Sequence, residues 1–251
     1  MSHIKPVVIC IAGFDPSGGA GLLADVKTVE NNSVYAMGVC TAITVQTENK
    51  FESVHWTPIE LIIEQLNFLM AEYSVAVFKI GLIRNSADLK IIINHIIEKK
   101  PAAKIIWDPI IKSSSGFSFH NEIDFSLNHI YLVTPNYYES KVLFKNADEN
   151  ILMEFSFQTN ILLKGGHNQE IQSNDVLFEN GVKHDLKSDR ILFEKHGSGC
   201  VLSSAIAAQL ANNRTLKTAC EMAKRYTYNY LKSHESLLGW HHSIEPSLIH
   251  E

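Results

Sequence analysis

The sequence predicts an α/β protein with a mostly parallel central sheet and a small antiparallel insertion late in the chain. Short runs rich in β-branched residues alternate with longer segments of helical periodicity. The first such run, 7–11, is apolar throughout, as expected of a strand buried on both faces. Asn180 and Gly181 separate two later strand-like runs, which is a strong signal for a two-residue hairpin. Together these three observations define the fold class.

The predicted strands of the parallel part are short. They cover residues 7–11, 39–45, 75–80, 105–107, 131–133 and 161–163, and the hairpin covers 175–179 and 182–186. Residues 190–193 are a candidate for a further strand. Because most of the earlier strands are separated by helical segments, the connections favour parallel pairing with helices on both faces of the sheet.

Five segments have the periodicity or composition of helices. They are 21–31, 58–70, 86–98, 198–211 and 215–232. In the second, apolar residues fall on one face, and Pro58 suits the first turn. Ser86 is the expected cap of the third helix, because a serine hydroxyl can accept a bond from a free N–H group there.

Length and charge limit the class of protein. The 251 residues are expected to form a single domain, 1–251, since α/β folds of this size commonly do. The net charge of −5 disfavours a nucleic-acid partner, whose recognition depends on an excess of positive charge. A local basic pocket for a small anion is still compatible with this charge.

The cysteines and the N-terminus indicate a reducing compartment. The four cysteines form no Cys-x-x-Cys pair, so zinc-ribbon and thioredoxin interpretations lack support. No apolar stretch has the length of a membrane span, about 18 residues, and residues 1–6 do not resemble a signal peptide. We therefore expect a cytoplasmic protein without a membrane partner.

The residues that directly follow most of the predicted parallel strands include carboxylates, amides and a lysine. In parallel sheets ligands bind at the carboxyl ends of the strands, so these residues are candidates for a site. They are Gly13 to Asp15, Gln46 and Thr47, Gly81 and Leu82, Asp108, Asn136 with Glu139, and Lys164 to Gly166.

The first glycine-rich loop, 13–21, joins the first strand to the first helix. Gly19, Gly21 and Ala24 fit a dinucleotide fingerprint formally, which leaves a nicotinamide-dependent oxidoreductase as an alternative. The acidic residue expected after the second strand is absent, however, and Gln46 and Thr47 stand there. The favoured interpretation is a loop whose backbone approaches a small substrate.

The second loop has the sequence His-Gly-Ser-Gly-Cys at 196–200 and opens a helix. The free N–H groups of a helix start, with the helix dipole, favour an anion at Gly197, Ser198 and Gly199. Cys200 falls in the first turn, where the pKa of a thiol is expected to fall.

Together these groups suggest phosphoryl transfer. Lys164 can neutralise phosphate charge, and Asp108 and Glu139 offer hard oxygen ligands for Mg²⁺. The N–H groups of Gly197 to Cys200 would stabilise charge on the transferred group. Phosphoryl transfer mostly requires positioning and electrostatic stabilisation, which these groups supply.

The motifs resemble those of the hydroxymethylpyrimidine/phosphomethylpyrimidine kinases of thiamine biosynthesis, in the ribokinase-like superfamily. The residues that carry the resemblance occur in family order at 12–21, 24–28, 41–47, 79–82, 108–110, 134–139, 163–167 and 196–200. The resemblance implies a three-layer α/β/α ribokinase-like domain that uses ATP and Mg²⁺ and forms a homodimer. It also implies phosphorylation of 4-amino-5-hydroxymethyl-2-methylpyrimidine and then of its monophosphate.

The resemblance assigns roles to residues of this chain. Gln46 would bond the aminopyrimidine, and Gly13, Asp25, Leu82 and Ile110 would line its pocket. Asn136 and Glu139 would organise Mg²⁺ and phosphates, with Asp108 nearby, and Lys164 would contact the ATP phosphates. Cys200 would face the substrate hydroxymethyl group, as a base or as a positioning group.

The sequence departs from the family pattern close to these residues. Ser198 replaces the usual threonine, and residues 192–195 and 111–116 differ from the common sequences. Two alternatives therefore stay open beside the oxidoreductase. One is a pyridoxine or pyridoxal kinase of the same branch, whose substrate is also a ring with a hydroxymethyl group. The other is a ligand sensor without activity, which the intact Lys164 and Asp108 disfavour.

Overall fold

The computed structural model describes residues 5–111, 127–146, 148–165, 174–187 and 193–241. All the strands of this part of the chain belong to one sheet, in the order β3-β2-β1-β4-β5-β6-β7-β8-β9. Six of them, from β2 to β7 in that order, are parallel. These are β1 (Val7–Phe14), β2 (Tyr35–Gln46), β4 (Val77–Ile80), β5 (Lys104–Trp107), β6 (Leu132–Val133) and β7 (Asn160–Leu163). The predicted parallel core is therefore confirmed.

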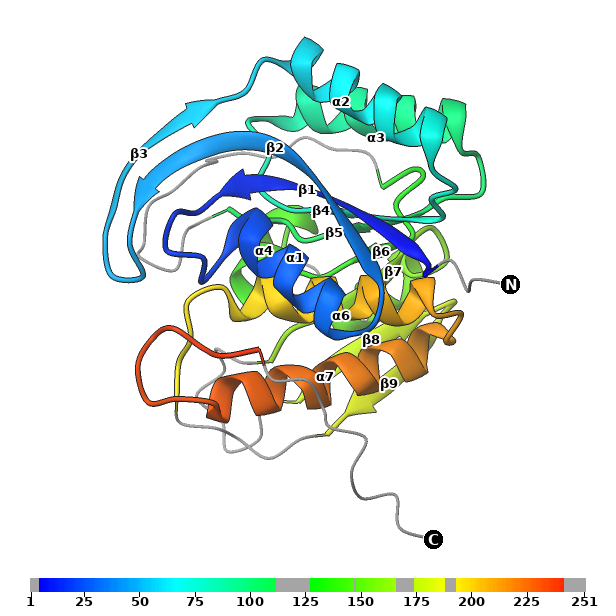
Figure 1. Cartoon of the computed structure of the whole chain (residues 1–251). Coiled ribbons are helices and arrows are strands. Elements are labelled where there is room, and N and C mark those ends of the chain that lie inside the picture. The colour runs from blue at the N-terminus through cyan, green and yellow to red at the C-terminus, as the bar shows by residue number, and fades with distance from the viewer. Residues whose placement is uncertain (1–4, 112–126, 147, 166–173, 188–192, 242–251) are drawn as a thin grey trace, which may run out of the picture.

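Antiparallel strands complete both edges of the sheet. The hairpin of β8 (Asp175–Glu179) and β9 (Val182–Leu186) has the predicted bounds and pairs antiparallel with β7. Its turn residue Asn180 has a φ of 49°, a left-handed conformation that asparagine tolerates well. At the other edge β3 (Phe51–Trp56), which we did not predict, turns back along β2. β2 and β3 continue past the end of β1 and curve over that edge of the sheet (Figure 1).

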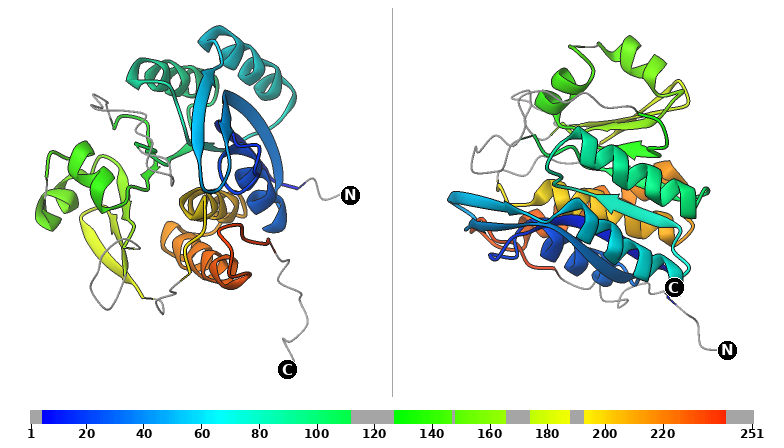
Figure 2. Two further views of the ribbon diagram at one scale, coloured as in Figure 1. Left: turned by 90° about the vertical axis from the view of Figure 1, so that its left-hand side faces the viewer. Right: turned by 90° about the horizontal axis from the view of Figure 1, so that it is seen from above.

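Helices cover the two faces of the sheet (Figures 1 and 2). α2 (Ile59–Glu72), α3 (Ser86–Lys99), α4 (Tyr137–Leu143) and α5 (Glu149–Phe155) bury apolar residues in one core. α1 (Gly21–Asn31), α6 (Ser198–Ala211) and α7 (Leu216–Lys232) bury theirs in the second core. Alternate residues of β1 enter opposite cores: Ile9 and Ile11 the first, Val8 and Cys10 the second. This arrangement explains why that strand is apolar throughout.

The starts of three helices were not predicted as the structure has them. α3 begins after Asn85, whose side-chain oxygen accepts the N–H group of Asp88 at 2.8 Å, so Ser86 is the first helical residue and the predicted cap at Ser86 was wrong. α4, which begins after Asn136, and α5, which begins after Asp148, lie in segments where no helix was predicted. The predicted strand at 190–193 lies mostly outside the described residues, and Phe193 is not in a strand.

α6 is the central helix of the second core. Every residue from Cys200 to Leu210 is buried, including Ser203, Ser204 and Gln209. A helix that is buried all round needs small or apolar residues on every side, and this one consists mainly of Ala, Ser, Leu, Ile and Val. Its N-terminus is thus held firmly against the sheet.

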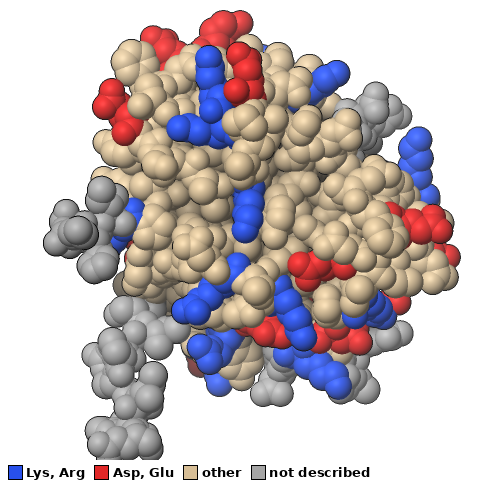
Figure 3. Space-filling view, turned by 90° about the vertical axis from the view of Figure 1, so that its right-hand side faces the viewer, with Lys and Arg blue, Asp and Glu red and all other residues tan. Residues whose placement is uncertain are grey.

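One face of the molecule carries charged side chains of both signs (Figure 3). On the face where β1 begins, Lys and Arg side chains lie among Asp and Glu side chains, and other residues cover most of the area (Figure 3). In the part of the chain that the structure describes, no helix combines the length and apolar character required to cross a bilayer.

Candidate functional site

The charged centre of the site consists of Asp108, Lys164 and Glu139. Asp108 follows β5, Lys164 follows β7, and Glu139 lies in the first turn of α4. Lys164 Nζ lies 2.8 Å from Asp108 Oδ1 and 3.7 Å from Glu139 Oε2. The strands bring these three residues together at the carboxyl edge of the sheet, as the sequence predicted.

Asp108 is buried, and its two oxygens have separate partners. Oδ1 accepts from Lys164 and from the hydroxyl of Thr134, and Oδ2 accepts from the hydroxyl of Ser203 on α6. Burial alone would raise the pKa of this carboxyl, but Lys164 and Lys79 outweigh it and hold the pKa below its usual range. Asp108 is therefore a fixed negative charge at neutral pH.

Asn136 and Glu139 form a capping box at the start of α4. The Glu139 N–H group donates to Asn136 Oδ1 at 2.8 Å, and the Asn136 N–H group donates to Glu139 Oε2 at 2.7 Å. Burial raises the pKa of Glu139, Asp108 adds to the shift and Lys164 opposes it. The cap fixes Glu139 beside Lys164.

The second glycine loop lies directly over this cluster. Gly197 caps α6 with a φ of 76°, a left-handed conformation that favours glycine. A Cβ atom on Gly199 would lie 3.3 Å from Lys164 Nζ and 3.8 Å from Asp108 Oδ2. The start of α6 and the charged cluster therefore border the same space, and Ser198 opens the helix there.

Cys200 is buried on the inner side of the same turn, with 5% of its surface exposed. Burial raises the pKa of its thiol to about 12, Lys79 opposes the rise, and Asp25 and Asp108 add to it. The predicted fall in pKa was wrong, because desolvation of the thiolate outweighs the favourable position at a helix start.

Three of the predicted pocket residues lie at the ends of neighbouring strands. A Cβ atom on Gly13 would lie 3.0 Å from the Leu82 side chain, and one on Gly81 would lie 3.8 Å from the Ile110 side chain. Gly13, Leu82 and Ile110 therefore surround the ends of β1, β4 and β5. Their contact with a pyrimidine stays a prediction.

Gln46 is the last residue of β2 and is held by a short chain of hydrogen bonds. Its side-chain amide donates to the hydroxyl of Thr44 at 2.9 Å, and that hydroxyl donates to the Phe14 carbonyl at 2.9 Å. These bonds fix the amide relative to the first glycine loop. The amide of Gln46 can form further hydrogen bonds, which is compatible with its predicted role in binding the aminopyrimidine.

Asp25 has a different environment from the one predicted. Its side chain has no exposed surface, both oxygens lie 2.8 Å from Lys79 Nζ, and Oδ1 also accepts from Ser204 at 2.7 Å. A carboxylate in these contacts lies beneath the site rather than on a pocket wall. Asp25 joins α1 to β4 and α6.

Lys79 belongs to one of the motifs that carry the family resemblance, but the sequence analysis gave it no role. It is fully buried in β4, where burial lowers its pKa but the charges of Asp25 and Asp108 outweigh that effect and raise it. A lysine inside the apolar run 77–80 was the available signal, because a buried charge requires a partner.

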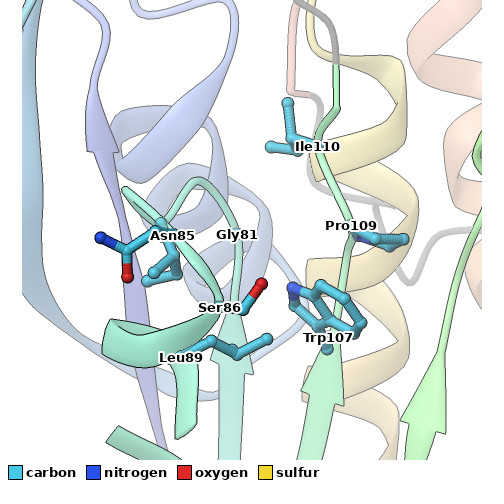
Figure 4. A pocket seen from close by; sticks show the side chains of 8 residues that line it. Gly81, Asn85, Ser86, Leu89, Trp107, Pro109 and Ile110 are labelled. Atoms are coloured by element: carbon cyan, nitrogen blue, oxygen red, sulfur yellow. The ribbon is translucent and has the colours of Figure 1, made fainter. Parts of the chain in front are cut away.

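A pocket opens beside these residues, between the ends of β4 and β5 and the start of α3 (Figure 4). The pocket is small: the centre of a water molecule can occupy about 20 Å³ of it, and it is partly open to solvent. Gly81 and Ile110, both candidates from the sequence, line it. The pocket residues are Gly81, Ile83, Asn85, Ser86, Leu89, Trp107, Pro109 and Ile110.

Asp108 and Glu139 are suited to bind a metal ion whose other ligands are phosphate oxygens and water. Within the described ranges, no group of three or more His, Cys, Asp or Glu side chains is arranged to hold a metal. Asp108 and Glu139 supply two carboxylates next to a lysine. Protein sites for Mg²⁺ commonly offer one or two carboxylates and leave the other positions to phosphates and water.

Solved structures define the class to which this fold belongs. The ADP complex of Bacillus subtilis pyridoxal kinase has a TM-score of 0.82 at 24% identity, covering 95% of this chain and 98% of the other. Phosphomethylpyrimidine kinase from Clostridium difficile 630 has a TM-score of 0.76 at 27% identity, covering 90% and 99%. The fold is thus that of the ribokinase-like vitamin kinases.

The sequence identifies the family within this class. A sequence model of the phosphomethylpyrimidine kinase family matches residues 15–245. A hydroxymethylpyrimidine/phosphomethylpyrimidine kinase of Staphylococcus aureus Mu50 is 32% identical over 241 residues, which are 89% of this chain and 87% of the relative. The chain belongs to the phosphomethylpyrimidine kinase family.

Proposed function

We propose that this protein transfers phosphate from ATP to 4-amino-5-hydroxymethyl-2-methylpyrimidine and then to the resulting monophosphate, in thiamine biosynthesis. The observation that carries the proposal is the position of Lys164 between Asp108 and Glu139, directly beneath Gly199 at the start of α6. In this arrangement the Lys164 ammonium group and the backbone N–H groups at the start of α6 border the same space.

The arrangement supports a division of roles in phosphoryl transfer. Lys164 would contact phosphate oxygens, and the N–H groups of Gly197, Ser198 and Gly199 would bind the charge that develops on the transferred group. Asp108 and Glu139 would hold Mg²⁺ together with the nucleotide phosphates, and Asn136 would fix Glu139. Mg²⁺ would neutralise phosphate charge while these side chains hold the reactants in place.

ATP is the proposed phosphate donor. Pyridoxal kinase of Bacillus subtilis, which shares the fold, was solved with ADP. Lys164 and the α6 N-terminus of this chain provide the positive groups that nucleotide phosphates require.

Gln46, Gly13, Leu82 and Ile110 are the proposed contacts of the pyrimidine. An amide at Gln46 offers a donor and an acceptor, which matches an aminopyrimidine edge. The absence of a side chain at Gly13 lets a flat ring approach the backbone. Asp25 would support this pocket from below through Lys79 and Ser204.

Cys200 is proposed to face the hydroxymethyl group as a positioning group. A thiol with a pKa of about 12 is protonated at neutral pH, so a resting thiolate is not available as a base. Cys200→Ser, which keeps a small hydrogen-bonding group, should then retain turnover within about tenfold, whereas loss of a general base costs about 10²–10⁴.

Several broader properties belong to the same proposal. The chain would act as a single cytoplasmic domain that pairs as a homodimer, and its partner molecules would be the small pyrimidine and ATP. One sheet that includes every described strand supports the single domain.

The test offers three substrates in parallel with ATP and Mg²⁺: hydroxymethylpyrimidine, its monophosphate and pyridoxine. Mass spectrometry of the products should show the pyrimidine converted through to its diphosphate. Turnover of pyridoxine alone would replace the proposed substrate with that of a pyridoxal kinase and leave the phosphate chemistry in place.

A further inference from the structure

The two glycine loops of the site are in direct backbone contact. A Cβ atom on Gly197 would overlap the carbonyl oxygen of Gly19 and lie 2.6 Å from Cα of Ala20. Gly197 is the N-cap of α6 and Ala20 is the N-cap of α1, so this contact joins the N-termini of two helices. The position of one loop therefore depends on the position of the other.

A buried carboxylate–imidazole pair spans the same junction. Asp15 Oδ2 lies 2.8 Å from His196 Nε2, and the two residues are 1% and 4% exposed. Asp15 also accepts the N–H groups of Ser17 and Ala20 and the hydroxyl of Ser17, each at 2.9 Å. One side chain thus organises the first loop and binds the second.

His196 is held from a third direction by the end of α7 and the segment that follows it. The His196 N–H group donates to the Leu237 carbonyl at 2.9 Å, and the Tyr230 hydroxyl donates to the His196 carbonyl at 3.4 Å. The adjacent Lys195 donates to the carbonyls of Ser236, at 2.6 Å, and His234. The backbone of the second loop is therefore fixed on both sides of His196.

The loop held in this way carries the donors of the proposed reaction. Gly199 lies beside Lys164 and Asp108 within the turn that follows His196. Electrostatic stabilisation of a transition state requires donors held within about 0.5 Å of the productive position. A displacement of about 1 Å can reduce a rate by about 10²-fold.

We infer that Asp15 and His196 form a positioning pair that holds the α6 donors in register with the first glycine loop. Neither side chain needs to touch the reactants, because both act through the backbone of their loops. The catalytic part of this inference rests on the proposed phosphoryl transfer, whereas the coupling between the loops does not.

The first test compares kinetics of His196→Ala, Asp15→Asn, the double variant and the conservative His196→Gln. The matched control is Gln209→Ala, which breaks a partly buried 2.9 Å bond between the other end of α6 and Asn32, the C-cap of α1. His196→Ala should lower kcat about 10²-fold, with KM for the pyrimidine within about threefold. The kcat of His196→Gln, whose amide can donate to Asp15, should be at least about tenfold higher than that of His196→Ala.

The double variant should lose no more activity than the worse single variant, because the two residues act as one unit. A loss in the double variant equal to the product of the two single losses would overturn the inference. A kcat for His196→Ala equal to that of Gln209→Ala would also overturn it.

The second test does not require activity. Hydrogen exchange followed by mass spectrometry should show faster exchange at 13–21 and at 195–200 together in His196→Ala, and at neither in Gln209→Ala. Unchanged exchange at 13–21 would also overturn the inference. If the expected exchange is seen while the wild type phosphorylates none of the substrates offered, the proposed function fails and the coupling of the loops stands.

Discussion

The ammonium group of Lys164 lies 2.8 Å from the Asp108 carboxylate, at the point where β5 and β7 end. Of the three charged side chains in the cluster, Lys164 is 15% exposed, against 2% for Asp108 and 6% for Glu139. The lysine is therefore the charged group that an incoming phosphate can reach most readily. Both carboxylates raise its pKa against the effect of burial, so it carries its charge at neutral pH.

Replacing Lys164 by glutamine should impair the use of ATP more than the binding of the pyrimidine. A hydrogen bond to a charged group contributes about 1.5–3 kcal/mol, so kcat/KM for ATP should fall roughly 10- to 150-fold. The dissociation constant of the pyrimidine, measured by calorimetry, should change less than about threefold. Lys183→Gln, on the exposed β8–β9 hairpin, is the control. Equal losses for both ligands would reject the phosphate role of Lys164.

Glu139→Gln should separate the capping role of this residue from a metal role. The amide oxygen can still accept the Asn136 N–H group, so the melting temperature should change little. Removal of a carboxylate ligand should raise the Mg²⁺ concentration at half-maximal rate at least about tenfold. Glu149→Gln removes an exposed acid from the first turn of α5 and serves as the comparison. Normal Mg²⁺ dependence would limit Glu139 to the helix cap.

Iodoacetamide should modify Cys40 before the other three cysteines. Cys40 is partly exposed, whereas Cys10, Cys200 and Cys220 are buried. With a pKa of about 12, Cys200 should have about one thiolate in 10⁴ molecules at pH 8, increasing tenfold with each pH unit. Peptide mass spectrometry over a time course gives the order. Rapid labelling of Cys200 at pH 8 would indicate a thiolate that burial does not suppress.

Lys79→Met should strongly lower the free energy of unfolding, although the ion pair that it removes is fully buried and leaves the surface unchanged. Removing one partner of a buried ion pair costs about 3–5 kcal/mol, because the Asp25 carboxylate is left without its counter-charge. Adding Asp25→Asn should restore part of the loss, since Ser204 can still bond the amide. Urea unfolding measures both changes. A double variant less stable than Lys79→Met would argue against the buried pair.

The sequence pattern predicted most strands of the sheet, and it also predicted that the charged residues lie close together. Asp108, Lys164 and Gly199 all follow a strand or start a helix, so the topology alone brings them to one edge. β3 was not predicted because its sequence, Phe-Glu-Ser-Val-His-Trp, does not alternate strictly.

Residues whose role depends on their partners were harder to predict. Asn136 and Glu139 have the spacing of a helix cap, yet we interpreted them only as ligands, and so missed α4. Asp25 and Cys200 were placed correctly on α1 and α6, but burial determines what each can do. The pairing of Asp15 with His196, 181 positions apart, has no signal in a single sequence.

The most direct measurement is the amount of ADP released per molecule of hydroxymethylpyrimidine when the reaction with excess ATP and Mg²⁺ reaches completion. The account predicts two molecules of ADP for each pyrimidine, because one site phosphorylates first the hydroxymethyl group and then the monophosphate. One molecule of ADP would confine the activity to the first step. No release with the pyrimidine, in a preparation that turns over pyridoxine, would contradict the central claim.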